Sequence, residues 1–180
     1  MVSQHKLSTR CHQPLTLGTQ LHITPCVELL PEVAAVKNCF VKPRGGLWTS
    51  SYVDSKSAWV DAHQDMFEES RGSAYELSWF LLEPDPAARV LVIDTLDDLR
   101  EVLAEHLYHP YPGLDLDSML GAWPDFERIA ERWDAMHLTE AGQWRTRLTI
   151  PSLYGWDSES TLWFRWCFKD CRRIEGQKAV

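Results

Sequence analysis

Short runs rich in β-branched and aromatic residues recur along the chain and predict a protein built mainly on β-strands. Such side chains fit the pleated, half-buried surface of a sheet. The predicted strands cover residues 20–24, 39–41, 46–50, 74–82, 89–94, 135–139, 144–150 and 161–168. The later runs follow one another with few helical patterns between them, which favours antiparallel pairing.

Three segments carry the 3.6-residue periodicity of amphipathic helices. Residues 54–67 begin with an Asp or Ser cap, and residues 95–107 begin with Thr95 and Asp98 spaced as a capping box. Residues 123–133 place Pro124 in the first turn, where a helix tolerates its missing N–H. We therefore expect an α+β fold, a split and mostly antiparallel β-sheet core with about three flanking helices.

Length and composition point to one folded unit. The chain has 180 residues, of which 44% are hydrophobic and 24% charged. We expect residues 1–180 to form a single domain with loosely ordered tails at 1–15 and 170–180. The start lacks an apolar signal core, no apolar run is long enough to cross a membrane, and five cysteines show no disulfide spacing. These features predict a cytoplasmic protein with no membrane partner.

Charge and ligand spacing argue against two classes of site. The net charge of −8 makes broad nucleic-acid binding unfavourable, because phosphates are repelled. His106 and His109 are three apart and Cys167 and Cys171 four apart, yet neither pair belongs to a complete zinc ligand set, so we predict no metal site. Nine tryptophans indicate an aromatic-walled cleft besides ordinary core packing.

Two carboxylates stand close together in the segment "GWDSES". If the chain is extended there, Asp157 and Glu159 lie on the same face, and their mutual repulsion raises one pKa, as acid–base chemistry requires. The segment is also rich in turn-forming residues, so a surface turn is the alternative.

The stretch "VKPRGGLWTSS", residues 41–51, has the composition of a ligand-binding loop. Its glycine pair permits a sharp turn and close approach of a ligand, and Lys42 and Arg44 add positive charge. Trp48 and the hydroxyls after it supply an aromatic wall with hydrogen-bonding groups, and the helix that follows could turn its first N–H groups toward an anion. The spacing of a P-loop is absent, so no nucleoside triphosphate site is predicted.

Taken in order, these motifs resemble the ADP-ribosyltransferase superfamily. The resemblance rests on "LHIT" in an early strand, "GGLWTSS" followed by a helix with "SAW", then "ARVLVIDTLDDL", "WDAMHLT" and a late glutamate. It implies a split β-sheet that binds NAD in a cleft. The longer strings "KPRGGLWTS" and "LYGWDSESTLWFRW" resemble small proteins of bacteria and their phages, from which no activity follows.

The resemblance also implies roles for individual residues. His22 and Thr24 would hold a ribose of NAD, and Trp48 or Trp59 would stack near the nicotinamide. The NAD-binding set is thus expected at these four positions together with Ser50.

The catalytic roles fall on the late carboxylates. Ser50 would orient Glu159, which would bind the ribose 2′-OH and stabilise the cationic sugar as the C–N bond breaks. Asp157 occupies the position where many transferases carry a second Glu or Gln, and its shorter side chain leaves the acceptor of ADP-ribose open. The resemblance thus implies an ADP-ribosyltransferase or an NAD glycohydrolase, acting in conflict between bacteria and phages.

Two other functions stay open at this point. A non-catalytic protein, such as a phage-type inhibitor, would bind a host protein through an aromatic patch, since Trp and Tyr are common interface anchors. RNA-end chemistry on the same type of core is a third, which the net charge of −8 disfavours.

Overall fold

The computed structural model describes residues 16–40, 42–63, 65, 77–108 and 123–175. Its centre is a seven-stranded sheet in the order β4-β7-β8-β2-β1-β3-β9. The strands are β1 (Gln20–Thr24), β2 (Leu47–Ser51), β3 (Ser78–Pro84), β4 (Val90–Ile93), β7 (Ala135–Leu138), β8 (Ser160–Trp163) and β9 (Phe168–Ile174). All neighbours pair antiparallel except β4 and β7, so the predicted α+β fold with a mostly antiparallel sheet is confirmed.

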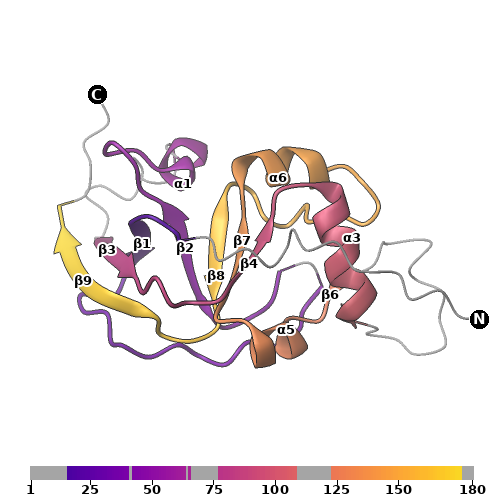
Figure 1. Ribbon diagram of the computed structural model, residues 1–180. Coiled ribbons are helices and arrows are strands. Elements are labelled where there is room, and N and C mark those ends of the chain that lie inside the picture. Colours follow the sequence, from indigo (N-terminus) through magenta and orange to yellow (C-terminus); the bar gives the residue numbers. More distant parts are fainter. Residues whose placement is uncertain (1–15, 41, 64, 66–76, 109–122, 176–180) are drawn as a thin grey trace, which may run out of the picture.

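Four helices accompany the sheet in the described ranges. They are α1 (Ala58–Ala62), α3 (Leu96–Glu105), α5 (Phe126–Arg132) and α6 (Glu140–Thr146). A two-stranded ribbon of β5 (Leu107–Tyr108) and β6 (Trp123–Pro124) lies beside α3. Helix α1 lies near β2, whereas α3, α5 and α6 surround the half of the sheet formed by β4, β7 and β8 (Figure 1).

The sheet splits between its fourth and fifth strands, β2 and β1. These strands pair at only two positions, Gln20 with Ser51 and Leu21 with Ser50. Beyond them β1 continues along β3 from Gln20 to Thr24, while β2 continues along β8. The sheet therefore divides into two halves that are joined at one end of the β1–β2 pair.

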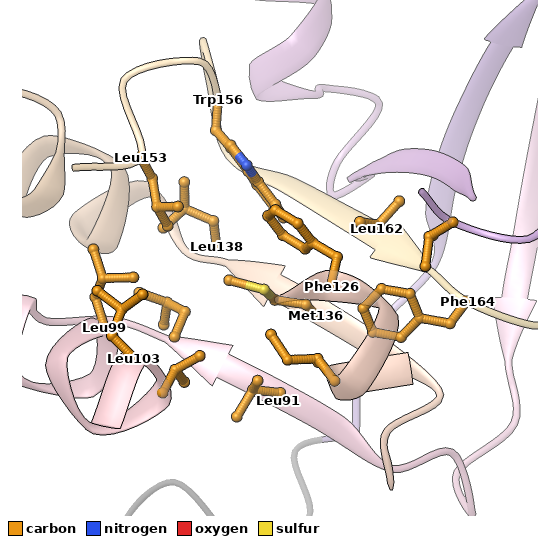
Figure 2. Packing of buried hydrophobic residues seen from close by; sticks show 14 residues of the cluster. Leu91, Leu99, Leu103, Phe126, Met136, Leu138, Leu153, Trp156, Leu162 and Phe164 are labelled. Atoms are coloured by element: carbon orange, nitrogen blue, oxygen red, sulfur yellow. The ribbon is translucent and has the colours of Figure 1, made fainter. Parts of the chain in front are cut away.

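The largest hydrophobic cluster lies between the β4–β7–β8 half and its helices (Figure 2). Met136 and Leu162 contribute from the strands, Leu99 and Phe126 from the helices, and Trp156 from the segment before β8. All five are at most 1% exposed. Each large side chain buried in this way contributes about 1.5–3 kcal/mol, so this cluster anchors the elements that carry the late glutamate.

The helix predicted at 95–107 forms as α3 because its signals are local. Thr95 accepts a hydrogen bond from the Asp98 N–H, and the Asp98 carboxylate accepts from the Thr95 N–H. The predicted helix at 123–133 begins later, at Phe126, because Asp125 is the cap and Pro124 belongs to β6. Of the helix predicted at 54–67, the described part is α1, capped by Ser57.

The strand predicted at 144–150 is wrong. Thr139 caps a helix there by accepting a hydrogen bond from the Gly142 N–H, and α6 extends to Thr146. The alternation of residues after Trp144 resembled a strand, but the N-terminal cap came earlier and determined the local structure.

Three boundaries near other strands also need correction. The strand predicted at 161–168 divides into β8 and β9, and no strand covers residues 39–40. The loosely ordered tail predicted from 170 is wrong for residues 170–174, because β9 pairs with β3 as far as Ile174. Residues 1–15 and 176–180 lie outside the described part.

Candidate functional site

A pocket of about 280 Å³ opens where β1 and β2 separate. It is lined by residues from β1, β2, β8, α1 and the two loops that precede β2 and β8. These residues are His22, Lys42, Gly46, Trp48, Trp59, Asp157, Ser158 and Ser160. The volume is near the lower end of the range of about 300–1,000 Å³ found for small-molecule sites. The pocket thus has room for part of a dinucleotide.

An ion pair stands at the edge of this pocket. The Lys42 Nζ lies 3.6 Å from Asp157 Oδ2, and the two side chains are 51% and 58% exposed. The same Nζ lies 5.2 Å from the centre of the Trp48 ring. Trp48 in turn packs edge-on against the buried Trp156, with ring centres 4.7 Å apart. The aromatic wall is therefore fixed from behind, while the lysine in front of it is free to change partners because the pair is exposed.

Glu159 is buried, and its carboxylate accepts hydrogen bonds from two serines of β2. Ser50 Oγ donates to Oε2 at 2.6 Å, and Ser51 Oγ donates to Oε1 at 2.8 Å. The Ser51 N–H also donates, at 3.0 Å to Oε2 and 3.2 Å to Oε1. Glu159 itself does not line the pocket, although its neighbours in the chain, Ser158 and Ser160, do.

Ser50 connects this carboxylate to the start of α1. Its Oγ accepts a hydrogen bond from Ser57 Oγ at 3.0 Å and one from the Trp59 N–H at 3.4 Å. With its own proton given to Glu159, the hydroxyl has one defined direction. The Trp59 N–H, one of the first N–H groups of α1, is thus already bonded and is not available to an anion.

The His22 ring links the two separating strands. Its Nδ1 lies 2.8 Å from the Trp48 carbonyl oxygen, which can only accept, so Nδ1 carries the proton and donates. Burial lowers the pKa of His22 more than this hydrogen bond raises it. The neutral ring therefore presents Nε2 as an acceptor for a hydroxyl group of a ligand.

The structure brings most of the predicted residues to one place. His22, Trp48, Trp59 and Asp157 line the pocket. Ser50 and Glu159 bond to each other but do not themselves line the pocket. These six residues come from four separate segments of the chain.

Thr24 does not line this pocket. Its hydroxyl accepts a hydrogen bond from the Cys26 N–H at 3.3 Å, in the turn that follows β1. It shares a strand with His22, but the pairing of β1 with β3 carries it away from β2.

Asp157 and Glu159 do not form the extended pair that their spacing suggested. Neither residue is in a strand, since β8 begins at Ser160. Asp157 is exposed and binds Lys42, whereas Glu159 is buried and binds serines. Each carboxylate therefore has its own partners and its own environment.

The glycine pair is explained by packing. Both residues have positive φ, and a Cβ on Gly45 would lie 2.3 Å from the Ala35 carbonyl oxygen. A Cβ on Gly46 would lie 2.3 Å from Leu162 Cδ1. The turn into β2 thus needs glycine to fit against its neighbours, and Gly46 also lines the pocket.

Sequence reasoning missed a row of buried polar groups behind the site. His137 and Thr161 pair across β7 and β8, and Thr161 pairs with Thr49 across β8 and β2. Gln20 accepts hydrogen bonds from both threonine hydroxyls. The available signal was His137, the one polar residue of the otherwise apolar strand β7, "AMHL".

Within the described ranges, no cluster of three or more His, Cys, Asp or Glu is arranged to hold a metal ion, and His109 lies outside those ranges. No helix among the described residues has the length and apolar character to cross a membrane. Comparison of the chain with protein-family models, curated proteins and solved structures gave no match.

Proposed function

We propose that the protein binds NAD in this pocket, cleaves the bond between nicotinamide and ribose, and transfers ADP-ribose to an acceptor or to water. The observation that carries the proposal is the hydrogen bond from Ser50 to the buried Glu159, whose chain neighbours Ser158 and Ser160 line a pocket together with His22 and two indoles. This bond joins the early and late parts of the chain at the point where the sheet splits.

The chemistry asks for a fixed negative charge near a developing cation. As the C1′–N bond breaks, the electron pair leaves with nicotinamide and the sugar becomes oxocarbenium-like. Three donors hold the Glu159 carboxylate in place before any ligand arrives, so little reorganisation is needed. An acceptor O–H or water then bonds to C1′ and releases its proton, which completes ADP-ribosyl transfer or NAD hydrolysis.

The lining matches the parts of the substrate. Trp48 and Trp59 offer flat apolar surfaces to the nicotinamide ring. The Nε2 of His22 accepts from a ribose hydroxyl. Lys42 is exposed beside the opening and supplies positive charge for a phosphate. The pocket volume suits the nicotinamide ribose half, with the adenosine half extending outward.

The acceptor would approach past Asp157. This carboxylate is exposed at the pocket edge and is held by a lysine that can release it. Its place next to the opening suits contact with an incoming nucleophile.

The test is nicotinamide release from NAD, followed by chromatography, together with NAD binding by calorimetry. We expect the wild type to release nicotinamide, and Glu159→Gln to lower the rate at least about 100-fold while NAD binding is retained. Glu131→Gln, an exposed carboxylate of α5, is the matched control and should behave as wild type. Wild-type protein that neither binds nor cleaves NAD over a wide concentration range would refute the proposal.

A second candidate is a non-catalytic protein that binds a partner through exposed apolar side chains. Trp144 on α6 is 69% exposed, and the loop after it exposes Leu148, Ile150 and Tyr154. Aromatic residues of this kind anchor protein interfaces. On this alternative, Trp144→Ala abolishes the capture of one dominant partner and Glu159→Gln does not. The enzyme proposal predicts instead that Glu159→Gln lowers turnover and that Trp144→Ala does not.

A further inference from the structure

A histidine that no part of the proposed reaction uses lies against Glu159. His137 of β7 is 5% exposed, and its Nδ1 lies 3.6 Å from Glu159 Oε1. The same nitrogen lies 2.9 Å from Thr161 Oγ1. Glu159 is thus contacted by serines of β2 and by an imidazole of β7.

The hydrogen bonds around Thr161 determine where the His137 proton is. Gln20 Nε2 donates to the Gly18 carbonyl at 3.2 Å, which fixes the amide with its oxygen toward the threonines. That oxygen accepts from Thr49 at 2.8 Å and from Thr161 at 3.0 Å. Thr161 has one hydroxyl proton, and Gln20 receives it. The 2.9 Å contact must therefore be the Nδ1–H of His137 donating to Thr161.

This polarity directs the Nδ1–H to Thr161 and leaves the ring beside the carboxylate. Nδ1 lies 2.9 Å from Thr161 Oγ1, which accepts its proton, and 3.6 Å from Glu159 Oε1, which is beyond hydrogen-bond distance. Because the ring is packed in the sheet and anchored on Thr161, its dipole has a fixed direction. Oε1 therefore receives a hydrogen bond from Ser51 and lies against the polar edge of the His137 ring without bonding to it.

Burial and the nearby carboxylates shift the pKa of His137 in opposite directions. Burial lowers the pKa of His137, and the carboxylates of Glu159 and of Asp94, after β4, raise it by less. Asp94 is itself bound by Arg145 of α6 at 3.0 Å. The net pKa is below the ordinary value of 6.5, so the ring is neutral at pH 7.5 and gains a proton only in acid. That proton would place a full positive charge beside Glu159.

We propose that His137 is a positioning residue for Glu159: its ring, anchored on Thr161, packs against the carboxylate and keeps it in the reactive orientation, and a second proton on that ring lowers turnover. This inference rests on the proposed NAD cleavage. Cleavage needs the negative charge of Glu159 unshielded, and an imidazolium within 4 Å neutralises much of that charge between two buried groups. The structure thus assigns the acid side of the pH–rate profile to His137.

The test compares His137→Ala and His137→Asn with the wild type across pH 5–8. An asparagine amide reaches the position of Nδ1 and keeps an N–H donor, but it cannot gain a proton. We expect His137→Ala to lower kcat about 10- to 100-fold with KM little changed. We expect His137→Asn to recover most of that loss at pH 7.5 and to move the acid fall in kcat to lower pH.

His106→Asn is the matched control, since His106 is also buried and burial also lowers its pKa, but it caps α3 away from Glu159. This variant should keep the wild-type acid fall. A His137→Ala enzyme with wild-type kcat, or a His137→Asn enzyme that is as slow as His137→Ala and keeps the acid fall, would overturn the inference.

A second measurement does not depend on activity. The His137 ring is titrated by NMR in the wild type and in Glu159→Gln. Loss of the carboxylate charge should lower the His137 pKa further, because that charge raises it. An unchanged titration overturns the inference even if NAD is cleaved. Absence of nicotinamide release from the wild type, with the titration shifted as expected, refutes the proposed function and leaves the His137–Glu159 contact established.

Discussion

Removing the Ser50 hydroxyl is the sharpest test of the geometry, because it needs no ligand. Ser50→Ala deletes the 2.6 Å donor to Glu159 Oε2, while the Ser51 N–H and hydroxyl still reach the carboxylate. A hydrogen bond to a charged group contributes about 1.5–3 kcal/mol. The same change leaves the Ser57 hydroxyl without its acceptor, which adds about 1 kcal/mol. We expect the free energy of unfolding to fall by about 2–4 kcal/mol.

Urea denaturation at pH 7.5 measures this loss, and the chain offers a matched control. Ser78 of β3 is 2% exposed, and its Oγ has no hydrogen-bond partner among the described residues. Ser78→Ala should therefore be neutral or slightly stabilising, because it removes a buried polar atom that gains nothing from burial.

A double-mutant cycle with Glu159→Gln isolates the bond itself. The two changes should be non-additive by about 1 kcal/mol or more, since both weaken the same interaction. The conclusion that Ser50 holds Glu159 in place is wrong if Ser50→Ala and Ser78→Ala unfold at the same urea concentration. It is also wrong if the free-energy changes of Ser50→Ala and Glu159→Gln simply add in the double variant.

Three further outcomes follow from the described contacts. Burial lowers the pKa of His22, His106 and His137, so the unfolded chain binds their protons at higher pH than the folded chain. The free energy of unfolding should therefore fall as pH drops below 6.5. Urea midpoints that stay level from pH 7.5 to 5.5 would contradict this. Lys42→Ala should change the free energy of unfolding by no more than about 0.5 kcal/mol, because its ion pair is exposed. In calorimetry it should weaken the binding of nicotinamide mononucleotide more than that of nicotinamide riboside, which lacks the phosphate. Equal weakening would show that Lys42 does not contact the phosphate. Gly46→Ala should lower the free energy of unfolding by about 1–3 kcal/mol, because the new Cβ would lie 2.3 Å from Leu162 Cδ1 and the residue has a positive φ. Thermal melts measure this loss, and an unchanged melting temperature would show that the turn adapts without cost.

The local signals of the sequence were sufficient for several elements. The spacing of Thr95 and Asp98 and the leucines after them gave α3, and alternation gave β1 with the bounds that the structure has. Such signals succeed because a cap or an apolar stripe acts within about four residues. They failed at α6, where the Thr139 cap preceded a run that alternated like a strand.

The candidate site, in contrast, depends on contacts between residues that are far apart in the sequence. The sequence supplied residue types, a hydroxyl after two glycines and a late glutamate, together with a resemblance that linked them. It could not establish the bond between Ser50 and Glu159, which lie 109 positions apart. Nor could it show that His137 stands 3.6 Å from that carboxylate, because its strand looked like ordinary core.

The sequence by itself therefore determined the elements whose signals lie within one helical turn or along one strand, together with the α+β class that they imply. Only the tertiary structure decided which strands pair and where β1 leaves β2. The pairing of β2 with β8 sets Thr49 opposite Thr161 and brings Ser50 and Ser51 to Glu159, and a shift of one residue in that register would displace both serines from the carboxylate. The pocket and its carboxylate thus exist through long-range pairing, which the packing of the whole chain selects.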